Sequence, residues 1–189
     1  MSATDHFPLP AGLPVPEDDG AANHLRGMRL PSVPLPATDG RTIDLAALRG
    51  TVVVYLYPRT GEPGKPLPEG WDAIPGARGC TPQSCAFRDH YADLRALGAD
   101  VFGLSTQTST YQMEAATRLH LSFALLSDAD LRFATALRLP TFTVAGMTLL
   151  KRLTMVVEDG VIAHVFYPVF PPDRNAGDVL AWLREKPTH

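Results

Sequence analysis

The chain contains two cysteines, Cys80 and Cys85, which lie five positions apart in the stretch PGARGCTPQSCAFRDHY. Thr81 and Pro82 follow the first cysteine, and this pair is typical of the N-cap and first position of a helix. Cys80 is therefore expected directly before a helix, where unpaired backbone N–H groups and the helix dipole stabilise a negatively charged thiolate. The thiolate is the reactive form of cysteine, so this position favours chemistry over packing.

An intact helix would keep the two sulfur atoms apart. Five helical residues advance about 7.5 Å and turn the second side chain away from the first, whereas disulfides rarely form beyond about 7 Å between Cα atoms. A bond across so short a loop would also contribute little entropic stabilisation. The pair is thus a poor structural disulfide, but it could act as a redox couple if the first turn of the helix unwound.

Two other interpretations of the cysteines stay open at this point. They could be independent thiols, because cysteine is a common small core residue. They could also bind zinc together with His90, although the spacing is not that of a C-x₂-C zinc knuckle and no second pair is present. A C-x-x-C redox motif is absent from the sequence.

The elements that would position the cysteines alternate between strands and helices. The apolar run TVVVYLY over residues 51–57 predicts a strand buried on both faces. One apolar stripe predicts a helix over residues 81–97, and its members are Phe87, Tyr91, Leu94 and Leu97. Further strands are expected over 99–105, 123–126, 152–157 and 161–166, and further helices over 108–119, 129–137 and 175–185. Asp-Gly turns predict hairpins at residues 39–40 and 159–160.

This order, β-α-β-α-β-α-β-β-α, implies an α/β protein with a central mixed sheet and helices on both faces, which is the layout of the thioredoxin fold. An N-terminal hairpin precedes the domain, and a Pro/Gly-rich insertion over residues 59–78 precedes the cysteine-bearing helix. Residues 1–28 are rich in Pro and Gly, so we expect an arm without a core of its own. The thioredoxin-like domain would then span residues 29–189.

The composition restricts the partners and the compartment. The 17 basic and 20 acidic residues give a net charge of −3 without long runs of either sign, so nothing indicates binding to nucleic acid or to a membrane surface. No apolar stretch approaches the ~20 residues that span a bilayer. The N-terminus does not resemble a secretory signal, so we expect a cytoplasmic protein. Structural disulfides are rare in that compartment.

The runs VVVYLYP, GCTPQSCAFRD and KRLTMVVEDGVI resemble the peroxiredoxins, most closely the peroxiredoxin Q or bacterioferritin-comigratory subgroup. The resemblance implies a thiol peroxidase that reduces hydrogen peroxide and organic hydroperoxides. Cys80 would be the peroxidatic cysteine and Cys85 the resolving cysteine, and the two would form an intramolecular disulfide. Thioredoxin or a similar dithiol protein would reduce that disulfide. The resemblance implies neither a metal nor an organic cofactor, and we expect a monomer or a homodimer.

The resemblance also implies a cation that stabilises the thiolate and the leaving oxygen. Arg152, in LLKRLTMVVEDG, matches the family's arginine on a late strand, and Lys151 is a weaker candidate. By the same resemblance the chemistry could serve a peroxide sensor or a thiol–disulfide relay with little peroxidase turnover. Peroxide consumption with a thioredoxin system would separate these functions from the enzyme.

The sequence departs from the family in the loop before Cys80. Peroxiredoxins carry Pro-x-x-x-Thr/Ser-x-x-Cys. In this sequence Ala73 stands at the position of the proline and Ala77 at that of the Thr/Ser. Thr60, in YPRTG, and Thr81 are the remaining candidates for the missing hydroxyl, although a threonine in such a loop is usually solvated. The departure concerns the activation of the peroxide and leaves the cysteine chemistry unchanged.

Overall fold

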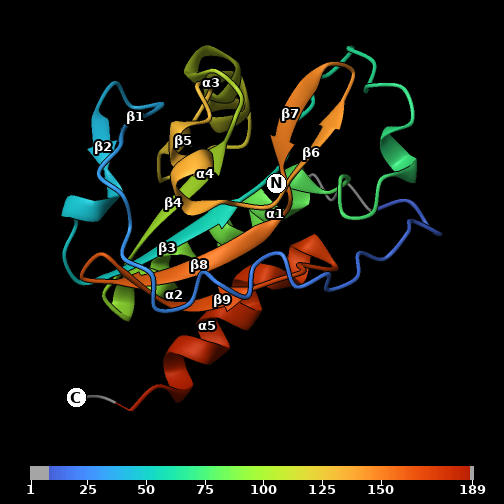
Figure 1. Cartoon of the computed structure of the whole chain (residues 1–189). Coiled ribbons are helices and arrows are strands. Elements are labelled where there is room, and N and C mark those ends of the chain that lie inside the picture. The colour runs from blue at the N-terminus through green and yellow to red at the C-terminus, as the bar shows by residue number, and fades with distance from the viewer. Residues whose placement is uncertain (1–8, 188–189) are drawn as a thin grey trace, which may run out of the picture.

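A five-stranded mixed sheet forms the centre of the computed structural model, which describes residues 9–187 (Figure 1). The strand order is β5-β4-β3-β8-β9. The strands are β3 (Thr51–Leu56), β4 (Ala99–Ser105), β5 (Leu125–Ser127), β8 (Leu153–Glu158) and β9 (Val161–Phe166). β3, β4 and β5 run parallel, whereas β8 pairs antiparallel with both β3 and β9. The expected mixed sheet is confirmed.

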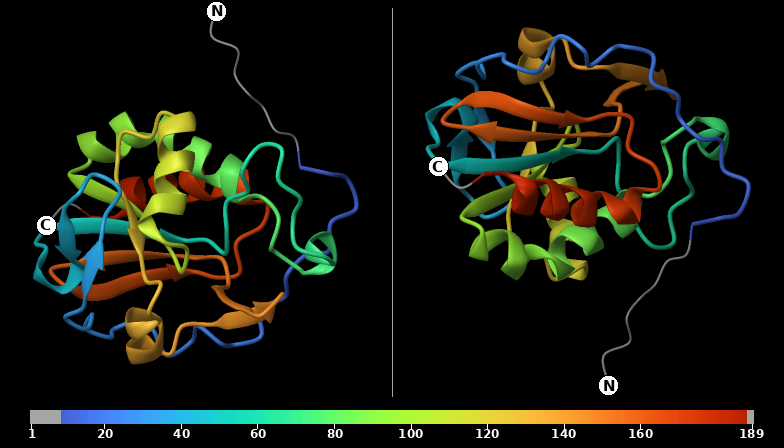
Figure 2. Two further views of the ribbon diagram at one scale, coloured as in Figure 1. Left: turned by 90° about the horizontal axis from the view of Figure 1, so that it is seen from above. Right: turned by 90° about the horizontal axis from the view of Figure 1, so that it is seen from below.

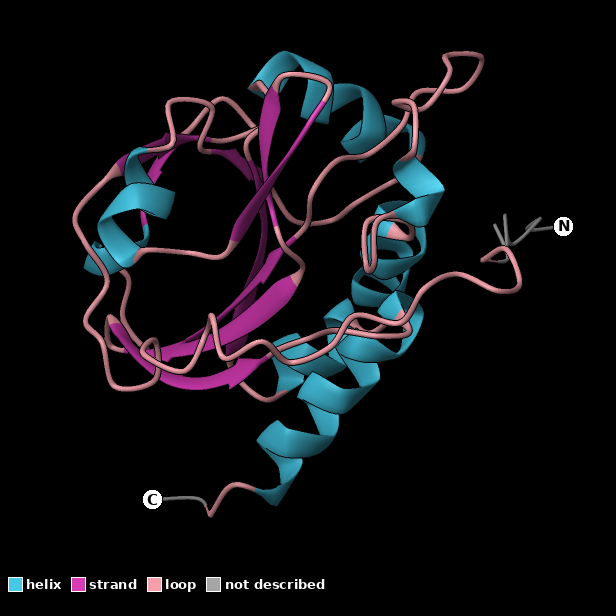
Figure 3. Cartoon of the chain, turned by 45° about the vertical axis from the view of Figure 1, so that its right-hand side comes forward, coloured by secondary structure: helices cyan, strands magenta, loops and turns pink. Residues whose placement is uncertain are grey.

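Helices cover both faces of this sheet, as the sequence predicts. They are α1 (Cys80–Asp89), α2 (Tyr91–Ala96), α3 (Ser109–Arg118), α4 (Arg132–Leu137) and α5 (Asn175–Glu185). Figures 2 and 3 show α1, α2 and α5 together on one face and α4 on the other. The alternation of β3 side chains explains this arrangement, because Val53 and Tyr55 pack toward α1 and α5 while Val52 and Val54 pack toward α4.

The helix expected over residues 81–97 is in fact two helices, which meet at His90. Its N-cap is Gly79 and not Thr81, so Cys80 is already the first helical residue. Leu97 was expected on the buried stripe, but its exposure of 43% shows that the stripe ends earlier. Leu94 stays buried beyond the break at His90, and Leu97 is exposed because α2 ends at Ala96 and Leu97 is its C-cap.

Hairpins account for most of the remaining extended structure. The hairpin of β1 (Pro34–Pro36) and β2 (Thr42–Asp44) and that of β8 and β9 form around the two predicted Asp-Gly turns. A third hairpin, β6 (Thr141–Val144) and β7 (Met147–Leu150), was not predicted. Its turn uses Ala145 and Gly146, both with positive φ, and alanine is an unusual residue for that conformation.

The N-terminal segment and the insertion both pack on the domain. Residues 1–8 of the expected arm lie outside the described part of the chain, but Ala22 and Leu25 are buried in the main core. Trp71 of the insertion is buried against Leu149 and Phe142. The insertion is therefore fixed beside the β6–β7 hairpin. Within residues 9–187, no helix has the length and apolar character needed to cross a bilayer.

Candidate active site

Cys80 lies at the first position of α1, in a buried site between the helix start and the sheet. The preceding residue, Gly79, has φ 110°, and a Cβ there would lie 2.6 Å from Pro172 Cγ and 3.1 Å from Leu9 Cδ2. Only glycine fits this conformation and this close approach. Gly79 thus lets the chain turn sharply into α1 and places Cys80 at the helix start, where the first N–H groups have no partner within the helix.

Arg152 donates a hydrogen bond from Nη2 to Cys80 Sγ at 3.1 Å. The arginine lies immediately before β8 and is buried, with 4% exposure. Its other acceptors are the backbone oxygens of Gly76, Ala77 and Arg78 and the side-chain oxygen of Gln83. No carboxylate within residues 9–187 contacts this guanidinium. The sequence-predicted pair is therefore brought together, and the cysteine sulfur is the one acceptor there that can carry a negative charge.

Three polar residues that sequence reasoning missed lie behind this pair. Gln83 donates from Nε2 to Asn175 Oδ1 at 3.0 Å, and Thr154 Oγ1 donates to the same oxygen at 2.6 Å. All three side chains are buried. Polar residues on a helix are usually exposed, so the sequence offers no local signal for Gln83 or Asn175. For Thr154, its place in an apolar strand next to Arg152 was an available signal.

A cavity of about 400 Å³ opens in front of Cys80. The insertion supplies much of its wall through residues such as Leu67 and Trp71, and the N-terminal segment adds Leu9 and Pro10. The volume falls within the range of small-molecule sites. The insertion and the N-terminal segment, which the sequence leaves without an assigned task, together enclose the space that faces the cysteine.

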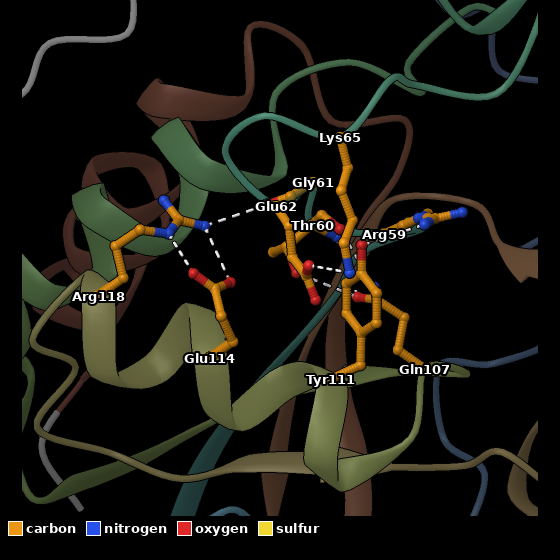
Figure 4. A network of polar contacts seen from close by, with 9 residues as sticks. All are labelled: Arg59, Thr60, Gly61, Glu62, Lys65, Gln107, Tyr111, Glu114 and Arg118. Atoms are coloured by element: carbon orange, nitrogen blue, oxygen red, sulfur yellow. Dashed lines mark hydrogen bonds and ion pairs between the residues drawn. The ribbon is translucent and has the colours of Figure 1, made fainter.

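The contacts of Thr60 are with Gln107, at the start of the insertion (Figure 4). The side chain of Thr60 is buried, contrary to the expectation of a solvated threonine, and both its Oγ1 and its backbone nitrogen donate to Gln107 Oε1. Gln107 donates in return to the Thr60 carbonyl at 3.1 Å. Thr60 therefore fixes the start of the insertion. Thr81 is half-buried and lines the cavity beside Cys80.

The start of the insertion has two further contacts with α3, which Figure 4 shows together. Arg118 donates to the Gly61 carbonyl at 3.1 Å, and Arg59 donates to Tyr111 Oη at 3.1 Å. Arg118 is also held by an ion pair with Glu114. These contacts make the beginning of the cavity wall a fixed part of the domain.

Cys85 lies one and a half turns farther along α1 and is half-buried. No disulfide joins it to Cys80. The helix between them is also anchored to β3, because Tyr55 donates from its hydroxyl to Ser84 Oγ at 3.0 Å in the core. Burial raises the pKa of Tyr55 well above its usual range, so this phenol keeps its proton.

Among the described residues, no group of three or more His, Cys, Asp or Glu side chains is arranged to hold a metal ion. The zinc interpretation with Cys80, Cys85 and His90 therefore has no geometric support. The arrangement around Cys80 instead offers a sulfur atom, a cation and a helix start at one point, which suits nucleophilic chemistry by a thiolate.

Comparison with known proteins identifies the family. The family model described as Redoxin matches residues 25–180, and the chain belongs to this family. Peroxiredoxin Q, chloroplastic, of Oryza sativa subsp. japonica is 30% identical over 191 residues, which cover 97% of this chain and 80% of the relative. Peroxiredoxin Bcp of Escherichia coli (strain K12) is 31% identical over 160 residues, which cover 82% of this chain and 92% of that protein.

A solved structure agrees with these relatives. The peroxidoxin BcpB of Mycobacterium tuberculosis matches with a TM-score of 0.70 and 26% identity, covering 86% of this chain and 98% of its own. Within the Redoxin family, the chain is a peroxiredoxin of the peroxiredoxin Q/Bcp group, and hence a thiol-dependent peroxidase with a thioredoxin-like fold. The resemblance noted from the sequence is confirmed.

Proposed function

We propose that Cys80 is the peroxidatic cysteine of this enzyme. Its thiolate attacks one oxygen of hydrogen peroxide or an organic hydroperoxide, so that an S–O bond forms and the O–O bond breaks. The sulfur is oxidised to a sulfenic acid, and the leaving oxygen takes a proton and departs as water or an alcohol. The observation that carries the proposal is the 3.1 Å contact between Arg152 Nη2 and Cys80 Sγ at the start of α1.

Arg152 has two tasks in this reaction. A buried cation is costly unless an anion balances it, and its remaining acceptors are neutral oxygens. The thiolate of Cys80 supplies that balance, so the pair favours the reactive form of the cysteine. The same guanidinium stabilises the negative charge that develops on the leaving oxygen.

Cys85 is proposed to resolve the sulfenic acid. Its thiol attacks Cys80 Sγ, an S–S bond forms, the S–O bond breaks, and water leaves. Both cysteines are in α1, whose regular geometry holds them too far apart for a disulfide, so the first turns of the helix must unwind. A thioredoxin-like dithiol protein then reduces the disulfide by exchange. This cycle needs a reducing compartment, and the cytoplasm remains our prediction for it.

Peroxide consumption in the presence of thioredoxin, thioredoxin reductase and NADPH tests the proposal. We expect turnover by the wild-type protein and none by Cys80→Ser. Cys85→Ser should react once with peroxide and then fail to turn over with thioredoxin. Stoichiometric oxidation of the wild-type protein without turnover would instead indicate a peroxide sensor, and unchanged turnover by Cys80→Ser would contradict the assignment.

A further inference from the structure

A buried series of side-chain hydrogen bonds runs from Arg152 across α1 to the start of α5. Arg152 Nη1 donates to Gln83 Oε1, and Gln83 Nε2 donates to Asn175 Oδ1 at 3.0 Å. Thr154 Oγ1 donates to that same oxygen at 2.6 Å. All four side chains are almost fully buried. The series therefore joins α1, α5 and the β8 end of the sheet directly behind Cys80.

The direction of these hydrogen bonds is set by chemistry. Arginine can only donate, so Gln83 must turn its oxygen toward Arg152 and its NH₂ group to the opposite side. A buried NH₂ group needs an acceptor, and Asn175 Oδ1 supplies it. Without this oxygen, no hydrogen bond from its NH₂ group would hold the amide of Gln83 in this orientation. Arg152 would then lose one of its fixed acceptors.

The geometry points to Asn175 as a positioning residue for the peroxide reaction, an inference that rests on the proposed function of Cys80. Asn175 holds the amide of Gln83, and Gln83 in turn directs Arg152 at the sulfur of Cys80. The effect reaches the reacting atoms through two other side chains, and Asn175 itself does not contact them. We call the contact between Gln83 and Asn175 the amide clamp.

The amide clamp also affects the second step of the cycle, because of where Gln83 lies. It is three residues after Cys80 and two before Cys85, in the part of α1 that must unwind before the disulfide can form. Every formation of the disulfide therefore breaks the clamp. Asn175 thus speeds the reaction with peroxide, which needs Arg152 in place, and slows disulfide formation, which needs α1 to open.

Asn175→Leu tests both effects, because leucine has the same branched shape, with somewhat greater bulk, and no acceptor. The first step is measured in a Cys85→Ser background by rapid mixing with hydrogen peroxide, where the product stops at the sulfenic acid. The second step is measured with Cys85 present as the rate at which the disulfide forms. We expect the first step to slow about tenfold, as for the loss of a charge-assisted contact. The second step should become about threefold faster, as for the loss of one neutral hydrogen bond that holds the helix closed.

Tyr55→Phe is the matched control. It removes the buried hydrogen bond from Tyr55 to Ser84, the residue after Gln83, and so loosens the same part of α1 without touching Arg152. We expect this variant to form the disulfide faster and to react with peroxide at the wild-type rate. Thr154→Val removes the second donor to Asn175 Oδ1 and should slow the first step by about threefold. It carries the test if Asn175→Leu does not fold.

The outcomes separate the inference from the function on which it rests. A first step slowed by Asn175→Leu but not by Tyr55→Phe, together with faster disulfide formation in both, supports the amide clamp. The inference is overturned if both variants leave the first step unchanged, if both slow it equally, or if Asn175→Leu slows both steps. Wild-type turnover with these results would leave the proposed peroxidase function intact, whereas a wild-type protein that fails to react would end both proposals.

Discussion

The two cysteines share one helix but lie in different surroundings. Cys80 is buried at the helix start, and an arginine held by four oxygen acceptors donates to its sulfur. Cys85 is half-buried farther along the same helix. The difference matches two chemical demands, because attack on a peroxide needs fixed charges at the sulfur, whereas resolution needs a thiol that moves. One helix meets both demands if its beginning is rigid in the reduced protein and unwinds after oxidation.

Replacing Arg152 should remove most of the difference in peroxide reactivity between Cys80 and Cys85. In Arg152→Met we expect the reaction with hydrogen peroxide to slow about 100-fold, or ~3 kcal/mol in the barrier, because a preorganised charge at the reacting centre is lost. Stopped-flow mixing with peroxide measures the rate. Lys151→Met is the control, since the neighbouring cation pairs with Asp19 away from the sulfur. An Arg152→Met protein that folds and reacts at the wild-type rate would exclude the arginine from the site.

Oxidation should join Cys80 and Cys85 and so remove the difference between their surroundings. A disulfide between Cys80 and Cys85 within one chain requires the start of α1 to unwind, so backbone amides 81–88 should lose protection from hydrogen exchange. Leu94 in α2 should change little, because it is anchored separately in the core. Mass spectrometry of the non-reduced protein checks the bond. A disulfide between two chains, or full protection of α1 after oxidation, would contradict a resolving role for Cys85.

Thr60, which fixes the start of the insertion, should affect the rate of reaction with peroxide less than Arg152 does. We expect Thr60→Val to react with hydrogen peroxide within about threefold of the wild-type rate and to lose about 1 kcal/mol of stability, because its hydroxyl bonds to Gln107 and not to the reacting atoms. Peroxide kinetics and urea unfolding measure the two effects. A fall in rate as large as that of Arg152→Met would show that Thr60 does supply the missing hydroxyl.

The smallest effect concerns the attachment of the N-terminal segment. Hydrogen bonds from Lys151 and then Tyr167 hold the pKa of Asp19 well below its usual range, and burial, together with the bond to Asp19, raises that of Tyr167 well above its own. The contribution of the Asp19 carboxylate to this attachment is therefore present above about pH 4 and is lost as the pH falls below that value. The contribution of the Tyr167 phenol to the attachment is present below about pH 10 and is lost as the pH rises above that value.

Limited proteolysis of the N-terminal segment across pH measures this attachment. We expect resistance between about pH 4 and 10 and faster cleavage outside that window, while Asp19→Asn should be cleaved somewhat faster at neutral pH. Peroxide reactivity at neutral pH should be unchanged in this variant. Cleavage that does not depend on pH or on Asp19 would show that other contacts, such as those of Leu25, hold the segment alone.

The sequence predicts those parts of the site that depend on local signals. The apolar run of β3 and the alternation of elements led to the correct fold, and the resemblance to the peroxiredoxins, which rests on short local runs, pointed to Arg152 beside Cys80. The polar side chains of Gln83 and Asn175 could not be predicted, because their burial depends on α1 and α5 meeting in space. The burial of Thr60, which was expected to be solvated, could not be predicted for the same reason, since its partner Gln107 is distant in sequence.

The errors in the elements have two causes, a contact between distant segments and a weak turn signal. Thr81 and Pro82 suit a helix start, but the close approach of Pro172 and Leu9 selects Gly79 as the N-cap. The hairpin of β6 and β7 was missed because an Ala-Gly turn is a weak signal compared with Asp-Gly.

The reaction of the two single-cysteine proteins with hydrogen peroxide tests the difference between the thiols most directly. Cys85→Ser keeps the thiol beside Arg152, and Cys80→Ser keeps the thiol farther along the helix. Under identical stopped-flow conditions at neutral pH, we predict that Cys85→Ser is oxidised at least about 100-fold faster, because only Cys80 combines the helix start with the guanidinium. Equal rates, or faster oxidation of Cys80→Ser, would contradict the assignment of Cys80 as the peroxidatic cysteine.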